Sequence, residues 1–247
     1  TSTRCIPAPT GPEGEMMGTL KGFDTPLDMG RHAPVLRRRG YDFVIRSYSR
    51  DPARNMGPLE ARQLSDAGLR IGALWEHGAT HAGYFTRQQG LLDGADALRC
   101  ARAVGQPAGS AIYVAVGHDA TREEVDGPIG AYFMGIRATL GGPAGYRVGV
   151  YGSGRCCAAM LDRGLATLSW LSQARGFAGT QGYAHAMRYD LLQWMATRIT
   201  LDGALFDITP DIGNPGRDPG LFRLGAHEGL APAAAAAPLR QELELRT

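Results

Sequence analysis

Short runs of apolar and β-branched residues recur along the chain, and each run ends in an acid, an amide or an aromatic residue. Ala111 to Asp119 shows the design most clearly, because an apolar run leads into the polar cluster Gly117-His118-Asp119. A continuous apolar run of this length is typical of a strand that is buried on both faces of a parallel sheet. We predict eight such strands, at residues 19–25, 43–48, 70–77, 111–119, 147–153, 167–174, 189–195 and 204–210.

Most of the segments between these strands carry the pattern of helices. Pro58 stands at the first turn of one predicted helix, and Gly68 is placed to end it. Thr121 begins a capping box, which predicts a longer helix over residues 122–140. Residues 175–187, between the sixth and seventh strands, are instead predicted to form a loop rather than a full helix.

The alternation of strands and helices favours a single (β/α)8 barrel of the TIM type, with a shortened helix between strands six and seven. A chain of 247 residues is long enough for this fold without a second domain. A doubly wound sheet that binds a dinucleotide is the competing fold. It is disfavoured because no GxGxxG follows the first strand, and Gly152-Ser153-Gly154 lacks the third glycine.

The two ends of the chain lack the strand and helix patterns of its middle. Residues 1–18 are rich in Pro, Gly and Thr and are predicted to be an irregular lead-in to a barrel domain at 19–214. Residues 215–247, which include an alanine run, are interpreted as an irregular tail or linker. The first residue is Thr1, which fits either a mature secreted form or a domain of a larger multidomain protein.

Composition and charge exclude several classes of function. The net charge of +2 gives no electrostatic case for binding nucleic acid or an anionic membrane, and no apolar segment is long enough to be transmembrane. The cysteines lack the spacing of a zinc site; Cys156 and Cys157 are predicted to be buried, and Cys5 leaves room for one disulfide. His77 and His81 are interpreted as polar loop residues rather than metal ligands. We therefore expect no metal and no cofactor.

Polar and aromatic side chains gather at the predicted strand ends. In a parallel barrel those ends share one face, which is where the active sites of such barrels lie. Aromatic rings stack on sugars, amides bind hydroxyl and acetamido groups, and two carboxyl groups cleave a glycosidic bond. A single acid at a strand end is more often a helix cap, and a single tryptophan is more often core. The whole set therefore carries more weight than any member: Asp24, Arg46, Glu76, His77, Tyr113, His118, Asp119, Tyr151, Trp170, Gln173, Gln193, Trp194 and Asp207.

The motifs that end these strands resemble a known family. They are similar, in order and spacing, to the glycoside-hydrolase-like barrel domains of bacterial secreted proteins, which resemble the family 25 muramidases (lysozyme-like enzymes). The resemblance runs from about Lys21 to Asn214. The motifs that carry it are Gly22-Phe23-Asp24, Ile45-Arg46-Ser47-Tyr48, Trp75-Glu76, Ile112 to Asp119, Gly149-Val150-Tyr151, Leu192-Gln193-Trp194 and Phe206-Asp207.

The resemblance implies catalytic carboxylates on strands one, four and eight. By position these are Asp24, Asp119 and Asp207, with Asp119 as the proton donor. The muramidase relatives carry a pair of acids on strand four, and the first of them falls on Gly117 here. We expect Glu76, at the end of the adjacent strand, to lie within one water of Asp119 and to compensate for the missing acid. The expected substrate-binding residues are Arg46, Tyr113, His118, Tyr151, Trp170, Gln193 and Trp194.

The sequence therefore predicts a hydrolase of the glycosidase class that cleaves peptidoglycan, the bacterial cell-wall glycan, in the manner of a muramidase. The expected location is extracytoplasmic, by secretion or delivery to the cell envelope. Two alternatives stay open because Gly117 replaces an expected carboxylate. The first is a catalytically silent carbohydrate-binding module, and the second is a toxin or effector domain of a larger delivered protein.

Overall fold

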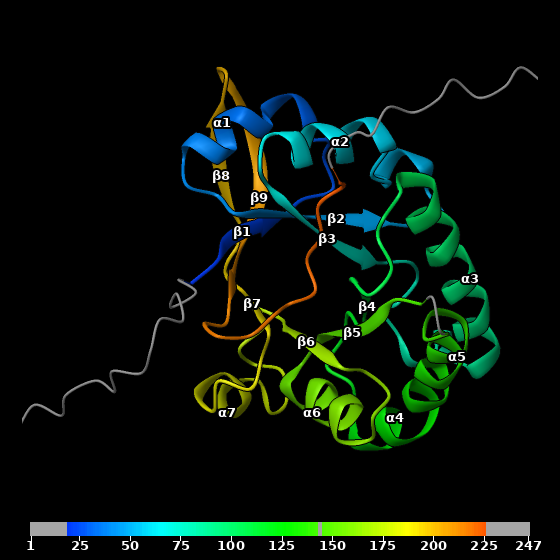
Figure 1. Cartoon of the computed structure of the whole chain (residues 1–247). Coiled ribbons are helices and arrows are strands. Elements are labelled where there is room, and N and C mark those ends of the chain that lie inside the picture. Colours follow the sequence, from blue (N-terminus) through cyan, green and yellow to red (C-terminus); the bar gives the residue numbers. More distant parts are fainter. Residues whose placement is uncertain (1–18, 143–144, 226–247) are drawn as a thin grey trace, which may run out of the picture.

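Eight strands of the described part of the chain close into a barrel, and helices lie outside it (Figure 1). The computed structural model describes residues 19–142 and 145–225. Seven neighbouring strands run parallel: β1 (Lys21–Asp24), β2 (Phe43–Tyr48), β3 (Arg70–Trp75), β4 (Ala111–Ala115), β5 (Arg147–Gly152), β6 (Leu168–Leu171) and β7 (Leu191–Gln193). The predicted TIM-type barrel is confirmed.

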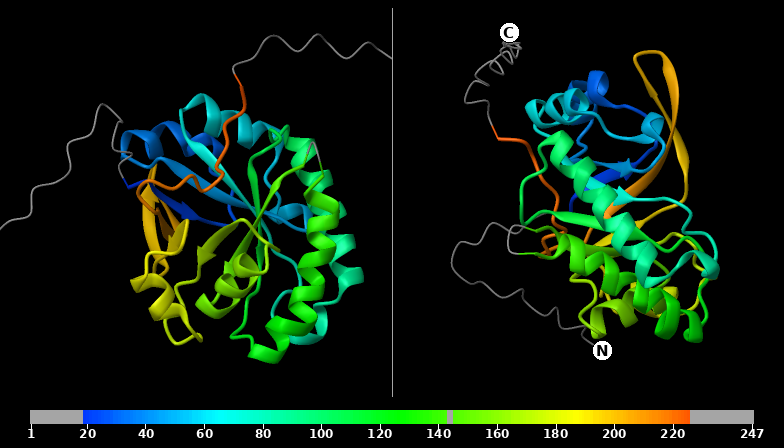
Figure 2. Two further views of the ribbon diagram at one scale, coloured as in Figure 1. Left: turned by 60° about the horizontal axis from the view of Figure 1, so that its bottom comes forward. Right: turned by 90° about the vertical axis from the view of Figure 1, so that its right-hand side faces the viewer.

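The barrel is closed by β9 (Ala204–Gly213), which runs antiparallel to both β1 and β7. The sequence predicted a strand here but also expected its carboxyl end to lie beside those of the other strands. The direction differs because β9 follows β8 (Thr197–Leu201) in a hairpin rather than a helical crossover. Asp202 and Gly203 form its turn with φ values of 49° and 84°, the left-handed geometry that tight hairpins need. The hairpin projects beyond the barrel (Figure 2).

The helices surround the strands on the outside of the barrel. Those between the strands are η1 (Gly30–His32), α1 (Ala33–Arg38), η2 (Pro52–Arg54), α2 (Pro58–Asp66), η3 (Ala82–Tyr84), α3 (Arg87–Val104), α4 (Arg122–Glu124), η4 (Val125–Ile129), α5 (Gly130–Leu140), α6 (Gly154–Asp162) and α7 (Thr180–His185). The capping box is present, since Thr121 and Glu124 exchange hydrogen bonds. The long helix predicted after it is built from α4, η4 and α5, with one π-helical turn. Between β6 and β7 the chain forms the short α7 where a loop was predicted.

Helices α3 and α5 pack unusually closely because glycines line their contact. A Cβ atom on Gly90 would lie 2.0 Å from the backbone oxygen of Tyr132, and one on Gly135 would lie 2.3 Å from that of Arg87. Both distances are far below any real contact, so only glycine fits at these two crossing points. The pair lies on the right of the barrel in Figure 1, where α3 contacts β2 and α5 contacts β5.

A buried ion pair fixes β2 to its neighbours. The guanidinium of Arg46 donates to both carboxylate oxygens of Glu60 on α2, at 2.6 and 3.1 Å, and to the backbone oxygen of Thr25 at 3.0 Å. Glu60 also accepts a hydrogen bond from the backbone N–H of Met29. Because each buried charge has partners, the pair orders the loop that follows β1.

The amino ends of the strands are covered by residues that follow β9. The backbone N–H of Ala111 donates to Gly220, and Ile71 and Phe222 exchange backbone hydrogen bonds. Tyr113 points to this end, because its hydroxyl donates to the backbone oxygen of Pro219 at 2.9 Å. The described part of the predicted tail is therefore irregular but packed on the barrel, and residues 226–247 lie outside the described range.

Two further expectations concern the cysteines and the membrane. Cys156 and Cys157 are buried on α6 with free thiols, as predicted. Cys5 and the lead-in 1–18 lie outside the described residues. Among residues 19–142 and 145–225, no helix is both long and apolar enough to cross a bilayer.

Candidate active site

A polar pocket of about 220 Å³ opens at the carboxyl ends of the parallel strands. Asp24, the last residue of β1, lies in it beside Glu76, which directly follows β3. Parallel strands bring these two acids together because their carboxyl ends share one rim. The complete lining is Asp24, Thr25, Pro26, Ile45, Arg46, Ser47, Arg54, Leu74, Glu76, Tyr151 and Gln193.

Two side chains from neighbouring strands orient the carboxylate of Asp24. Gln193 on β7 donates from Nε2 to Oδ2 of Asp24 at 2.8 Å. Tyr151 on β5 donates from its hydroxyl to Oε1 of the same glutamine at 2.8 Å. The backbone N–H of Gln173, which can only donate, also reaches Oε1 of Gln193 at 3.4 Å, so the amide nitrogen is the atom that faces Asp24.

Asp211 on β9 lies beneath Asp24 and is completely buried. Trp170 donates from Nε1 to Oδ1 of Asp211 at 2.8 Å, while Oδ2 accepts no hydrogen bond from the described residues. Burial, with the nearby Asp24 as a further cause, raises the pKa of Asp211 well above the usual range for a carboxyl group. This shift favours the protonated form of Asp211 beside Asp24.

Asp24 is tuned to titrate near neutral pH. Its pKa is raised from 3.8 to about 6: burial and the charge of Glu76 raise it, whereas the hydrogen bond from Gln193 and the neighbouring Asp211 lower it. Desolvation penalises the charged form of a carboxyl group and so favours the protonated acid. A carboxyl group of this kind can hold a proton at mildly acidic pH and give it to a bound molecule.

The second carboxylate of the pocket has a different environment. Glu76 is about half exposed and forms an ion pair with Arg54, which comes from the short helix η2. Arg54 is therefore part of the pocket, although no sequence pattern pointed to it. The two acids thus differ in kind: Asp24 is partly enclosed and bonded to an amide, and Glu76 is open and paired to a cation.

Asp119 and Asp207, the other expected catalytic acids, do not line this pocket. Asp119 is exposed, and its Oδ1 accepts a hydrogen bond from the backbone N–H of Ala178 at 2.8 Å, which anchors the loop before α7. Asp207 lies on the projecting hairpin, exposed and paired with Arg198. The antiparallel direction of β9 explains this, because it carries Asp207 outward and leaves Asp211 at the level of the pocket floor.

The predicted substrate-binding residues divide by burial. Tyr151 and Gln193 line the pocket, and the Trp194 side chain is 46% exposed directly after β7. Arg46 reaches the pocket edge, but its guanidinium is taken up by Glu60. The remaining three face protein rather than a cleft: Tyr113 and Trp170 are fully buried in the barrel, and His118 is bonded to Glu124 and packs against Phe85.

Gly117 lies at the rim between β4 and its neighbours. A Cβ atom there would be 3.2 Å from the backbone oxygen of Ala79, in the loop after β3. That spacing is tight, so a larger residue needs a small shift of the loop. No residue of β4, nor any of 116–119, lines the Asp24 pocket. The rim at this position therefore contributes no acid to it.

Comparisons with known proteins agree with this architecture. A family model described as an Rv2525c-like, glycoside hydrolase-like domain matches residues 35–204. The uncharacterized protein YbfG of Bacillus subtilis is 29% identical over 222 residues, covering 84% of this chain and 30% of YbfG. FadG of the same organism is 27% identical, covering 73% of this chain and 32% of FadG. The chain thus spans about a third of the length of these curated relatives.

Two solved structures have the same fold at low sequence identity. The Tat-secreted protein Rv2525c of Mycobacterium tuberculosis, in complex with HEPES, has a TM-score of 0.65 at 20% identity, covering 83% of this chain and 98% of that one. The modular autolysin LytC of Streptococcus pneumoniae, in complex with a synthetic peptidoglycan ligand, has a TM-score of 0.51 at 12% identity, covering 79% and 46%. The chain belongs to the Rv2525c-like family of glycoside hydrolase-like domains, because the family model matches residues 35–204, which is most of the chain.

Proposed function

We propose that this chain is a glycoside hydrolase that cleaves peptidoglycan outside the cytoplasm. The observation that carries the proposal is Asp24, a partly enclosed carboxyl group with a pKa of about 6, in one pocket with a second carboxylate, Glu76. Most glycosidases need such a pair, one group to protonate the leaving oxygen and one to act at the anomeric carbon. Membership of a glycoside hydrolase-like family and the fold shared with a cell-wall autolysin support the substrate class.

In this proposal Asp24 protonates the glycosidic oxygen. Gln193 holds the acid in place, and protonated Asp211 stabilises the carboxylate that remains after the proton has left. Glu76 stabilises the positive charge that develops on the sugar, or positions the attacking water. Arg54 keeps Glu76 in place by their ion pair. Tyr151 supports the arrangement through its hydrogen bond to Gln193.

Asp119 is the alternative proton donor, as the resemblance to muramidases implies. In this arrangement the loop that carries Ala178 would have to release Asp119 before the acid could reach a substrate. Asp207 would then act from the hairpin. The enclosure and raised pKa of Asp24 favour it as the donor.

The proposal is tested by incubating the protein with purified peptidoglycan and reducing the new sugar ends chemically before mass analysis. A muramidase leaves reducing N-acetylmuramic acid ends, and a glucosaminidase leaves reducing N-acetylglucosamine ends. New reducing ends that form with wild-type protein, but not with the Asp24→Asn variant, support the proposal. Their absence with peptidoglycans of several cross-linking types contradicts it.

The cleavage rate is expected to fall as pH rises above about 6. Asp24 must be protonated to act as the acid, and with a pKa of about 6 its protonated fraction falls about tenfold per pH unit above that value. The check is a profile of kcat/KM between pH 4 and 9 on a soluble glycan fragment. A rate that stays flat from pH 5 to 8 would exclude Asp24 as the donor.

A catalytically silent glycan-binding domain is the second candidate function. It is favoured by the absence of any side chain from β4, or from Gly117, in the lining of the Asp24 pocket. If it is correct, wild-type protein binds glycan without cleaving it, and Gly117→Asp gains cleavage. Gly127→Asp is the matched control, since it adds the same charge at an open, exposed position on η4, away from the Asp24 pocket. Equal, measurable cleavage by wild type and both variants would exclude this candidate.

A further inference from the structure

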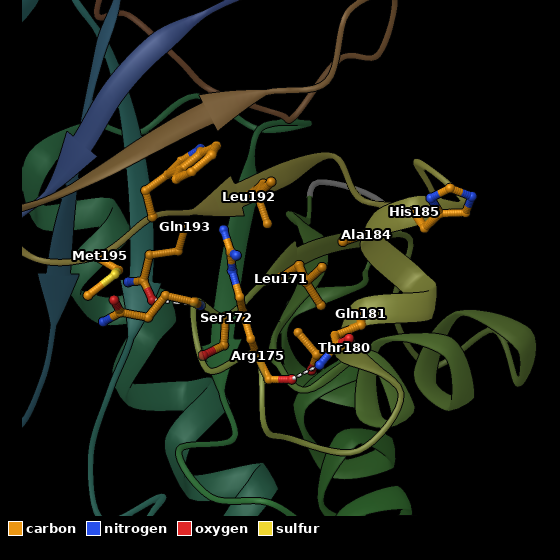
Figure 3. Close-up of a pocket in the computed structure, with 12 residues that line it drawn as sticks. Leu171, Ser172, Arg175, Thr180, Gln181, Ala184, His185, Leu192, Gln193 and Met195 are labelled. Carbon is orange, nitrogen blue, oxygen red and sulfur yellow. Dashed lines mark hydrogen bonds between the residues drawn. The ribbon is translucent and has the colours of Figure 1, made fainter.

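A second hollow adjoins the Asp24 pocket, between the ends of β6 and β7 and helix α7 (Figure 3). Its volume is about 430 Å³, which is within the roughly 300–1,000 Å³ range of ligand pockets. Gln193 lines both hollows, so its amide is the wall between them. A glycan bound at Asp24 would therefore pass Gln193 to enter this second hollow.

The surface of this hollow combines apolar side chains with an aromatic ring. Leu192 and Ala184 contribute accessible apolar surface, and Leu171 is fully buried behind it. Figure 3 shows the three residues on the two strands and the helix that surround the space. Trp194 forms a further part of the lining, with 46% of its side chain exposed. An exposed indole ring beside apolar surface suits the face of a sugar ring and the methyl of an acyl group.

The charged residues of this hollow differ from those of the Asp24 pocket, whose two arginines are each paired with a carboxylate. Arg175 lines it, whereas none of its described lining residues is an acid. The guanidinium carbon of Arg175 lies 5.8 Å from the centre of the Trp194 ring, and the arginine forms no ion pair with the described residues. Figure 3 shows its side chain extending from the loop before α7 towards β7. By contrast, the Asp24 pocket holds two acids.

An arginine held over an aromatic ring, with no acid beside it, is suited to bind an anion. We propose that this hollow is a subsite for a sugar that carries a carboxylate and an acyl group, and that Arg175 selects glycans with that carboxylate. The carboxylate accepts hydrogen bonds from Arg175, the sugar ring stacks on Trp194, and the acyl methyl contacts Leu192. The inference rests on the proposed glycan function of the Asp24 pocket, but it requires binding only and not cleavage.

The test compares two tetrasaccharides that differ in their carboxylates. One is chitotetraose, which has four acetamido groups and no carboxylate. The other is the glycan tetrasaccharide of peptidoglycan, freed of peptides, which adds a lactyl carboxylate on alternate sugars. Affinities are measured by calorimetry on the Asp24→Asn background, so that a cleaving enzyme leaves the ligands intact. The carboxylate-bearing glycan is expected to bind more tightly, by about tenfold, and the difference is expected to shrink as salt rises.

The variants separate recognition of the anion from general effects of removing a charge. Arg175→Gln is expected to lower the affinity for the carboxylate-bearing tetrasaccharide about tenfold and to leave the affinity for chitotetraose unchanged. Arg175→Lys is expected to recover part of the lost affinity. Arg188→Gln is the control: Arg188 also lies over a ring, Tyr183 at 5.2 Å, but it is paired with Asp162 and lies outside the hollow. It should leave both affinities unchanged.

Three results would overturn this subsite. They are equal binding of the two tetrasaccharides, an Arg175→Gln variant with unchanged preference, and no binding of either glycan. Cleavage could still be found in the first two cases, so they contradict the subsite without contradicting the proposed function. Conversely, Arg175-dependent binding without any cleavage supports the subsite and contradicts the enzymatic proposal.

Discussion

Replacing Asp24 with asparagine is expected to lower the rate of glycan cleavage by about 10²- to 10⁴-fold, the usual effect of losing a general acid. Asparagine keeps the size of the side chain, and its oxygen can still accept the hydrogen bond from Gln193. It has no carboxyl proton to give to the leaving oxygen. The measurement is the initial rate of release of reducing ends from peptidoglycan, with Asp119→Asn tested in parallel. If Asp119→Asn abolishes cleavage and Asp24→Asn does not, Asp119 is the donor.

The stability of the same variant provides an independent control. The pKa of Asp24 is about 6 in the folded protein, against an ordinary value of 3.8 for an exposed aspartate, so the folded state binds the proton more tightly than the unfolded chain. The free energy of unfolding therefore falls as pH rises from 3.8 to about 6, and the whole destabilisation from ionised Asp24 is present above pH 6. The Asp24→Asn variant has no carboxyl group to ionise and so escapes this destabilisation. Its gain in unfolding free energy over wild type is expected to grow from pH 4 to pH 7, by up to about 2–3 kcal/mol. A variant that is less stable than wild type at pH 7 would point to a fold defect instead.

The barrel could be predicted because each strand is buried on both faces and leaves a continuous apolar run in the sequence. The last strand was located correctly but was assigned the wrong direction. Hydrophobicity does not encode direction, and the decisive signal was local: Asp202-Gly203 is a hairpin turn between two alternating segments, 197–201 and 204–208. The helix α7 was missed because it has only six residues, which is too short for a clear helical period.

Part of the candidate site could also be read from strand ends. Asp24, Glu76, Tyr151 and Gln193 were selected in that way, and all four line one pocket. Asp211 was not selected, because its place beneath Asp24 depends on antiparallel pairing, in which it lies opposite Gly22. No pattern along the chain indicates that pairing. Asp211 could have been selected only if the final strand had been predicted to run antiparallel to the others.

Aromatic residues on strands were the least predictable part of the site. Inside a closed barrel, side chains fill successive layers, so only a residue at the last level of a strand reaches solvent. Trp170 lies within β6 and is covered, with its ring edge-on to Tyr113 and Tyr151. Trp194 directly follows β7 and is exposed. Each tryptophan follows a polar residue and precedes an apolar one, so the local sequence pattern does not separate the buried ring from the exposed ring.

Replacing Trp170 with alanine is expected to reduce the free energy of unfolding by about 3–5 kcal/mol, because the change empties a fully buried site. It also removes the hydrogen bond from Nε1 to Asp211, which leaves that buried oxygen without its donor. Trp194→Ala is the matched control, since its ring is partly exposed and its loss should cost little stability but weaken glycan binding. The measurements are chemical denaturation and glycan affinity for both variants. Trp170→Phe, which keeps most of the ring volume, should recover much of the stability lost in Trp170→Ala. A Trp170→Ala variant as stable as wild type, or a Trp194→Ala variant that loses stability and keeps full affinity, would reverse the roles assigned to the two rings.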